Sequence, residues 1–330
     1  MQTRKIGPFE VSAIGLGCMN LSHAYGTPPD AAAGAALLHK ALDLGYTFFD
    51  TASLYGGGAN ETLVGNTLKS RRSEFVLASK CGLTIVDGKG VIDGRPEVLK
   101  KTCDDSLARL QTDVIDLYYL HRLDKKVPIE DSVGALAELV KAGKIRTIGL
   151  SEMSAATIRR AHSVHPVTAV QSEYSLWTRN PEYGVLDACT ELGIGFVAFS
   201  PVARAFLTGK LRDVSGLAPK DIRLSMPRFQ SPNFEENLKL LDGYAAIARE
   251  ADCTMAQLAL AWLLARAPNI VPIPGTANLD HLAENAAAAD VTLNPGLMSR
   301  LEALINKDTV HGPRYNAVAQ ANIDTEEAPA

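Results

Sequence analysis

The sequence lacks the features that define several whole classes of protein. Its five cysteines are scattered, odd in number and never arranged as CxxC, which argues against a disulfide framework or a zinc site. The longest apolar run, residues 258–265, is far below the roughly 18 residues that span a bilayer. The N-terminus carries no apolar segment typical of a secretory signal. We therefore expect a cytoplasmic protein with no metal site and no contact with a membrane.

An excess of positive charge is also missing. The 33 Lys and Arg residues against 37 Asp and Glu residues give a net charge of −4, whereas a nucleic-acid-binding protein needs a basic surface. Hydrophobic residues make up 46% of the 330-residue chain. That content is sufficient for one large core or two ordinary ones. Charged residues make up 21% of the chain, which excludes a disordered or fibrous protein.

Short apolar runs rich in Ile, Val and Phe alternate with segments of helical periodicity along the chain. The expected strands are residues 14–17, 46–50, 75–80, 114–120, 147–150, 169–171, 195–200 and 270–274. The expected helices include residues 31–44, 96–110, 132–142, 155–165, 183–192, 237–264 with a break at 252–254, and 279–287. This unbroken alternation predicts an α/β fold, a (β/α)8 TIM barrel, as a single domain over residues 1–330.

Three segments exceed what such a barrel needs. Residues 3–11 predict an N-terminal β-hairpin with Gly7-Pro8 at its turn, residues 202–232 a long loop after strand seven, and residues 307–330 a polar C-terminal tail. An open doubly wound sheet is the alternative architecture, and it would place a glycine-rich turn after the first strand. The segment Gly15-Leu-Gly17 only partly fits that turn, because the third glycine and the directly following helix are missing.

Four polar residues lie at or just after the ends of predicted strands: Asp50, Tyr55, Lys80 and His121. In a barrel these ends converge on the face that holds the active site. The Lys80 ammonium is expected to pair with Asp50 and to lower the pKa of Tyr55, so that the phenol can act as a general acid–base. His121 can donate a hydrogen bond to a carbonyl oxygen. Taken singly, such a residue is more often a cap, a rim charge, a packing residue or a surface residue, so the prediction depends on all four lying at strand ends.

The segments that carry these residues, DTASLYGGG, LASK and DLYYLHR, resemble the aldo-keto reductases in order and spacing. Further segments continue the resemblance, which extends from about residue 5 to residue 304: GKIRTIGLSE, AVQSEYS, FVAFSPVARAFLTGK and PIPGTANLDHLAEN. The long segment after strand seven is similar to the microbial and plant members. The resemblance implies a (β/α)8 barrel that binds an extended nicotinamide cofactor without a Rossmann domain.

The resemblance also implies a reaction and a set of roles. A hydride would pass from NAD(P)H to an aldehyde or ketone, with Tyr55 as the proton donor, Lys80 and Asp50 as its tuning pair, and His121 orienting the carbonyl. The implied cofactor-binding residues are Gly17, Cys18, Met19, Asp50, Ser151, Glu152, Gln171, Phe199, Ser200, Pro201, Arg204, Leu207, Gly209, Lys210, Gly275, Thr276, Asn278, His281, Glu284 and Asn285.

Two positions depart from the pattern of many family members. Glu152 stands where they carry Asn, although a carboxylate can still accept from the carboxamide of the cofactor. Ala277 and His281 stand where Lys or Arg would grip a 2′-phosphate. The helix expected from Leu279 offers backbone N–H groups instead, so NADPH is the expected cofactor and NADH is possible.

Two other functions remain open at this point. One is a noncatalytic regulatory or sensor subunit that binds cofactor on the same barrel. The other is a barrel hydrolase or isomerase, which would need a carboxylate pair or a metal cluster at the strand ends. We expect the substrate to contact the loops at residues 21–29, 84–94 and 213–232 and the tail around Arg314. The sequence identifies neither that substrate nor the oligomeric state.

Overall fold

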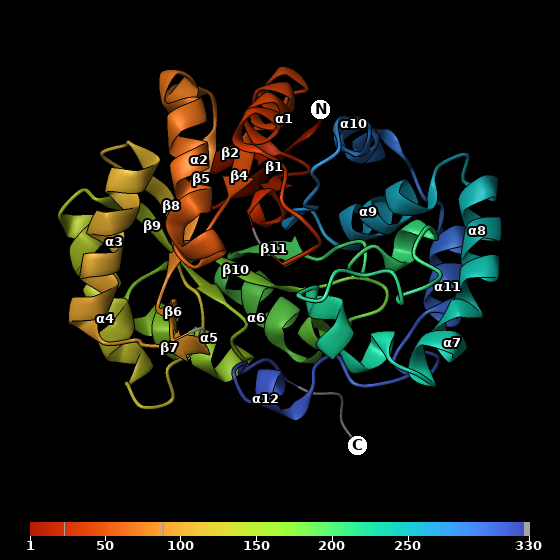
Figure 1. The fold of residues 1–330 in the computed structure, drawn as a ribbon. Helices are drawn as coiled ribbons and strands as arrows, with labels where there is room; N and C mark the ends of the chain where they lie inside the picture. Colours follow the sequence, from red (N-terminus) through yellow and green to blue (C-terminus); the bar gives the residue numbers. More distant parts are fainter. Residues whose placement is uncertain (23, 88, 327–330) are drawn as a thin grey trace.

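The computed structural model describes residues 1–22, 24–87 and 89–326 and contains the expected barrel (Figure 1). Eight parallel strands lie side by side in chain order: β3 (Leu16–Gly17), β4 (Phe48–Asp50), β5 (Val76–Cys81), β8 (Ile115–Leu120), β9 (Ile145–Ser151), β10 (Val167–Glu173), β11 (Gly195–Phe199) and β12 (Ile270–Pro272). The backbone nitrogens of Gly15 and Gly17 donate to the carbonyl oxygens of Pro272 and Pro274, at 3.0 and 3.4 Å. These bonds join the first strand to the last, so the sheet closes and the doubly wound alternative is wrong.

Each strand is followed by at least one helix that covers the outside of the barrel. These helices are α1 (Ala31–Asp43), α2 (Ala59–Leu68), α3 (Pro96–Leu110), α4 (Ile129–Lys141), α5 (Ala155–Val164), α6 (Val185–Leu192), α9 (Met255–Arg266) and α10 (Leu279–Ala287). Several begin at a residue whose side chain caps the helix: Asp30 caps α1, Ser154 caps α5, and Thr254 with Gln257 forms a capping box on α9.

A further group of helices lies beyond α9 (Figure 1). It consists of α7 (Asn233–Leu238), α8 (Leu240–Glu250) and α11 (Pro295–Leu304). The expected break at residues 252–254 is the turn between α8 and α9. Helices α2 and α11 fall outside the helical segments that periodicity had singled out. In α2 the buried face includes polar Asn60 and Glu61, so its apolar pattern is weak.

The hairpin of β1 (Thr3–Ile6) and β2 (Phe9–Ser12) closes the N-terminal end of the barrel, as expected. Its fully buried Ile6 and Val11 pack with the side chains that fill the barrel interior, which include Phe48, Leu117 and Tyr119. A separate, larger core fills the space between strands and helices. Because the N-terminal end is plugged, a ligand can enter only at the opposite mouth.

Three segments surround that mouth. A second hairpin, β6 (Leu83–Val86) and β7 (Lys89–Ile92), occupies the expected loop 84–94. The long loop after β11 contains three short 3-10 turns. The tail returns to the barrel and carries α12 (Ala317–Gln320). Among the described residues, no helix has the length and apolar character to cross a membrane.

Candidate active site

Asp50 and Lys80 lie at the mouth ends of the neighbouring strands β4 and β5 and form a buried ion pair. The Lys80 ammonium donates to Asp50 Oδ1, to the backbone oxygen of Thr51 at 2.8 Å and to Tyr55 Oη at 3.3 Å. An ammonium has three N–H donors, and all three are therefore used. The charge of Lys80 is fixed between one carboxylate and one phenol.

Tyr55 starts a 3-10 turn, Tyr55–Gly58, that follows strand β4. Gly56 and Gly57 adopt φ values of 58° and 62°, a left-handed conformation that glycine accepts readily. This is the local reason for the run of glycines after the tyrosine. His121 follows β8, and its ring meets that of Tyr55 edge to face at 6.0 Å between centroids. The four predicted catalytic residues thus lie together.

Burial dominates the electrostatics of the two rings. It raises the pKa of Tyr55 above the ordinary value of 10, while the positive charge of Lys80 acts in the opposite direction. The expectation of a lowered phenol pKa is therefore wrong in this state, because the phenol is desolvated. Burial, with Arg122 and Lys80, holds the pKa of His121 well below 6.5. Near neutral pH we expect a protonated phenol and a neutral imidazole.

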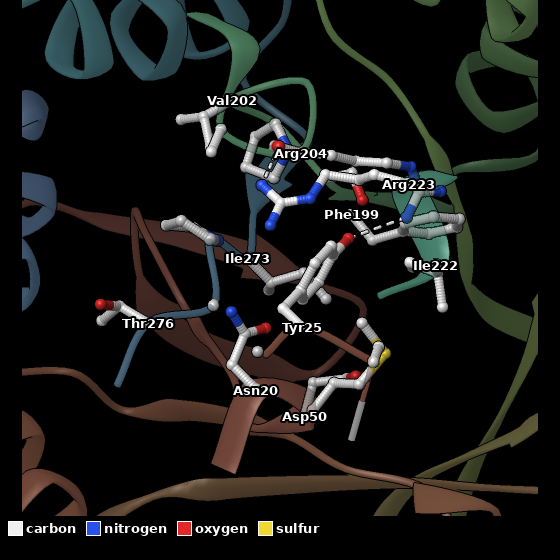
Figure 2. A pocket seen from close by; sticks show the side chains of 18 of the residues that line it. Asn20, Tyr25, Asp50, Phe199, Val202, Arg204, Ile222, Arg223, Ile273 and Thr276 are labelled. Carbon is white, nitrogen blue, oxygen red and sulfur yellow. Dashed lines mark hydrogen bonds between the residues drawn. The ribbon is translucent and has the colours of Figure 1, made fainter. Parts of the chain in front are cut away.

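A cavity of about 1100 Å³ extends from this group to the start of helix α10. Asp50, Tyr55 and His121 line one end of it, and Thr276 and Asn285 line the other. Figure 2 shows Tyr25 between Asp50 and the segment after β11, where its hydroxyl accepts from Arg204 at 2.9 Å. The cavity is therefore long and partly covered.

Most of the residues predicted to bind the cofactor line this cavity. They are Gly17, Met19, Asp50, Ser151, Gln171, Phe199, Ser200, Pro201, Arg204, Lys210, Gly275, Thr276, Asn278, His281, Glu284 and Asn285. The other four predicted residues, Cys18, Glu152, Leu207 and Gly209, are not part of its lining. Two lining residues are held by polar contacts: the Gln171 amide donates to Asp50 Oδ2 at 2.7 Å, and the Ser151 hydroxyl accepts from Arg122 at 3.1 Å.

The start of α10 differs from the open anion site that the sequence suggested. The side-chain oxygen of Asn278 accepts from the backbone nitrogens of Asp280 and His281 at 2.7 and 3.1 Å, and the Thr276 hydroxyl accepts from the nitrogen of Asn278 at 3.0 Å. The helix thus caps its own N–H groups. A cation lies nearby instead, because Lys210 Nζ is 3.3 Å from His281 Nε2.

Glu152 is completely buried and is not part of the cavity lining. Its carboxylate accepts two hydrogen bonds from Arg314 of the tail, one from Thr325 and one from the backbone nitrogen of Glu173. Burial opposes ionisation, but the charge of Arg314 lowers the pKa of Glu152 below its ordinary value. The sequence suggested that Glu152 contacts the cofactor directly. In the structure its carboxylate is buried and is hydrogen-bonded to protein groups instead.

Arg204, predicted to cover a pyrophosphate, is likewise held by protein groups. Its guanidinium contacts Glu173 at 2.6 Å, Tyr25 at 2.9 Å and Tyr315 at 3.0 Å. Burial alone would raise the pKa of Glu173. The positive charges, mainly those of Arg204 and Arg314, outweigh burial and lower this pKa to about 2. Sequence reasoning missed this cluster. The acid at the end of a buried strand implies a basic partner, but nothing in the sequence shows which of the arginines supplies it.

Comparison with known proteins identifies the family of this chain and several similar structures. A model of the Aldo/keto reductase family matches residues 13–306. The structure is similar to the glycerol dehydrogenase AKR11B4 from Gluconobacter oxydans, with a TM-score of 0.86 and 28% identity over 94% of this chain and 97% of that one. It is also similar to the holo form of the aldo-keto reductase AKR11C1 from Bacillus halodurans, with a TM-score of 0.77 and 29% identity over 93% and 97% of the two chains.

A third similar structure is an aldo/keto reductase from Klebsiella pneumoniae in complex with NADP and acetate. Its TM-score is 0.74, with 27% identity over 95% of this chain and 98% of that one.

Proposed function

Because this chain belongs to the aldo/keto reductase family, we propose that it is an NADPH-dependent oxidoreductase that reduces the carbonyl group of an aldehyde or ketone. The observation that carries the proposal is the Lys80 ammonium, which joins Asp50 and Tyr55 at the end of a long cavity beside His121. A positioned phenol with a cation at its oxygen is a proton donor whose conjugate base is stabilised.

The residues at the cavity fit an extended nicotinamide dinucleotide. Phe199 offers a ring for stacking, and Ser151 and Gln171 offer polar groups close to the catalytic end. Gly17 lets the cavity wall pack closely against the segment after β12, because a Cβ at this position would lie 2.8 Å from the backbone oxygen of Ile273. Lys210 brings positive charge to the far end, and the similar Klebsiella pneumoniae enzyme is a complex with NADP. These features support NADPH.

The roles of the chain's own residues follow from their contacts. When bound, the dinucleotide supplies a hydride to the carbonyl carbon. The neutral ring of His121 donates a hydrogen bond to the carbonyl oxygen and orients it. Tyr55 transfers its phenolic proton to that oxygen as the C–H bond forms, and the resulting alcohol is neutral. Lys80 stabilises the phenolate left on Tyr55. Asp50 forms an ion pair with Lys80, and the Gln171 amide holds that carboxylate in place by a hydrogen bond.

The raised pKa of Tyr55 agrees with this direction of transfer, since the phenol is protonated before reduction begins. The test is to follow NADPH oxidation by the purified protein with a panel of aldehydes and ketones, and to titrate NADPH binding separately. We expect NADPH to bind and at least one carbonyl class to be reduced. Cofactor binding without turnover of any carbonyl would contradict the proposal.

A further inference from the structure

Arg122 differs from the other arginines at the cavity because its charge is not neutralised by an acidic side chain. Arg204 is paired with Glu173 and Arg223 with Asp221. Arg122 is half-buried and lines the cavity. Its Nη1 donates to the backbone oxygen of His121 at 2.6 Å and to Ser151 Oγ at 3.1 Å. Over residues 1–22, 24–87 and 89–326 it forms no ion pair.

Glu152 is an acid on which the charge of Arg122 acts, because Arg122 helps to lower its pKa. Its carboxylate already accepts hydrogen bonds from other groups. An ionised carboxylate offers about four lone-pair positions. Glu152 uses Oε1 for the Glu173 nitrogen and for Arg314 Nη2, and Oε2 for Arg314 Nη1 and Thr325 Oγ1. The C-terminal tail, which supplies Arg314 and Thr325, thereby leaves Arg122 without a carboxylate partner.

The acidic groups near Arg122, among the residues that the structure describes, are already paired with other basic residues. Asp50 is paired with Lys80, and Glu173 is paired with Arg204 and Arg314. His121 is neutral near neutral pH. Nη1 of Arg122 is occupied, whereas Nε and Nη2 have no hydrogen-bond partner within the described part of the chain and can bind an acceptor. These two nitrogens form the planar fork that suits a carboxylate. One positive charge therefore remains beside the residue that is proposed to orient the carbonyl.

We propose that Arg122 binds a carboxylate of the substrate, so that the preferred substrates are aldehydes or ketones with a carboxylate within a few bonds of the carbonyl. The proposal rests on the proposed carbonyl reduction. Since Arg122 directly follows His121 in the chain, the anionic group and the reacting carbonyl are held by neighbouring residues. The substrate class is thus selected by charge as well as by the apolar wall of Leu54 and Leu83.

The test compares matched substrates that differ only in charge: 4-oxobutanoate with its methyl ester, and phenylglyoxylate with its methyl ester. For each pair, kcat/KM is measured with wild type, Arg122→Met and Arg122→Lys. We expect wild type to prefer the acids. The acid-to-ester ratio should fall about 10- to 100-fold in Arg122→Met, as expected for one charged hydrogen-bonded contact. It should fall less in Arg122→Lys, which keeps the charge.

The double variant Arg223→Gln/Asp221→Asn is the matched control, because it removes a cavity arginine whose charge is already neutralised. Its acid-to-ester ratio should stay within about threefold of wild type. Binding of benzoate and benzamide to the NADP⁺-saturated protein gives a readout that does not need turnover. We expect benzoate to bind more tightly than benzamide in wild type, and this difference to disappear in Arg122→Met.

Three results would overturn the proposal. The first two are a wild-type enzyme that prefers the esters and an acid-to-ester ratio that Arg122→Met leaves unchanged. The third is an equal loss of kcat/KM on acids and esters in Arg122→Met together with weaker NADPH binding, because Arg122 would then contact the cofactor and not the substrate. Failure of the proposed function looks different. In that case no carbonyl is reduced by wild type, and the benzoate comparison alone decides whether Arg122 is a carboxylate site.

Discussion

The guanidinium of Arg314 donates hydrogen bonds of 2.8 and 2.6 Å to the two carboxylate oxygens of Glu152, 162 residues earlier in the chain. Its Nε also contacts Glu173 at 3.1 Å. One tail residue thus forms ion pairs with acids at the ends of two neighbouring strands, β9 and β10. All three side chains are buried. The tail is therefore an integral part of the barrel mouth.

We expect Arg314→Met to destabilise the protein strongly, by about 3–5 kcal/mol at pH 7, because it leaves the buried carboxylate of Glu152 without its ion-pair partner. Urea unfolding followed by circular dichroism measures this. The double variant Glu152→Gln/Arg314→Met should regain part of the loss, since one buried charge is then removed. A loss below about 1 kcal/mol in Arg314→Met would show that the cluster contributes little to stability.

The same cluster predicts how stability depends on pH. The pKa of Glu173 is about 2 in the folded protein and that of Glu152 is also lowered, whereas an unfolded Glu titrates near 4.3. The stabilisation is therefore present above about pH 4.3 and is lost as pH falls toward 2. The gap in unfolding free energy between wild type and Arg314→Met should shrink over this range. A gap that stays constant down to pH 3 would contradict the assignment.

Tyr55→Phe should remove the proposed proton donor and retain the ring that packs against His121. We expect kcat for carbonyl reduction to fall by about 10²–10⁴-fold, the usual contribution of positioned proton transfer. The Kd for NADPH, measured by fluorescence titration, should change by less than about threefold. Turnover close to wild type would exclude Tyr55 as the donor.

Lys80→Met should alter the pH dependence of alcohol oxidation, which needs the phenolate of Tyr55. Lys80 opposes the rise of the Tyr55 pKa that burial causes. Without the ammonium the phenol pKa rises further, and the rate profile should move to higher pH by about one unit or more.

This variant also leaves Asp50 buried without its partner. Lys80→Met/Asp50→Asn is therefore measured beside it, with the melting temperature of each protein as a check on folding. If the profile of a folded variant matches wild type, Lys80 does not tune Tyr55.

Lys210→Met tests the cofactor preference. We expect wild type to prefer NADPH to NADH, because Lys210 brings positive charge to His281 at the end of the cavity. Loss of one charge-assisted phosphate contact should lower the NADPH-to-NADH ratio of kcat/KM by about tenfold. Lys220→Met, an exposed lysine of the same loop that is not part of the cavity lining, is the control and should leave the ratio unaffected. A wild-type preference for NADH would contradict the predicted cofactor.

The barrel and the four residues proposed as catalytic are predictable from the sequence alone. Alternating strand and helix patterns are local, so each of the eight strands was found at the expected place. Asp50, Tyr55, Lys80 and His121 were identified because parallel strands all point to one mouth, and a residue at a strand end must lie there. The helix expected at residues 279–287 matches α10 for the same local reason, since its periodicity lies within the segment itself.

The pairing of the remaining charges follows from the folded arrangement and not from any local pattern. Glu152 was expected to face the cofactor, and it is held instead by Arg314 from the distant tail. The phenol of Tyr55 was expected to have a lowered pKa, and burial raises it instead. Ion pairing and desolvation depend on which side chains meet in space and how deeply they lie, and no local pattern records either. The unneutralised charge of Arg122 is a consequence of that pairing, so it too appears only in the folded chain.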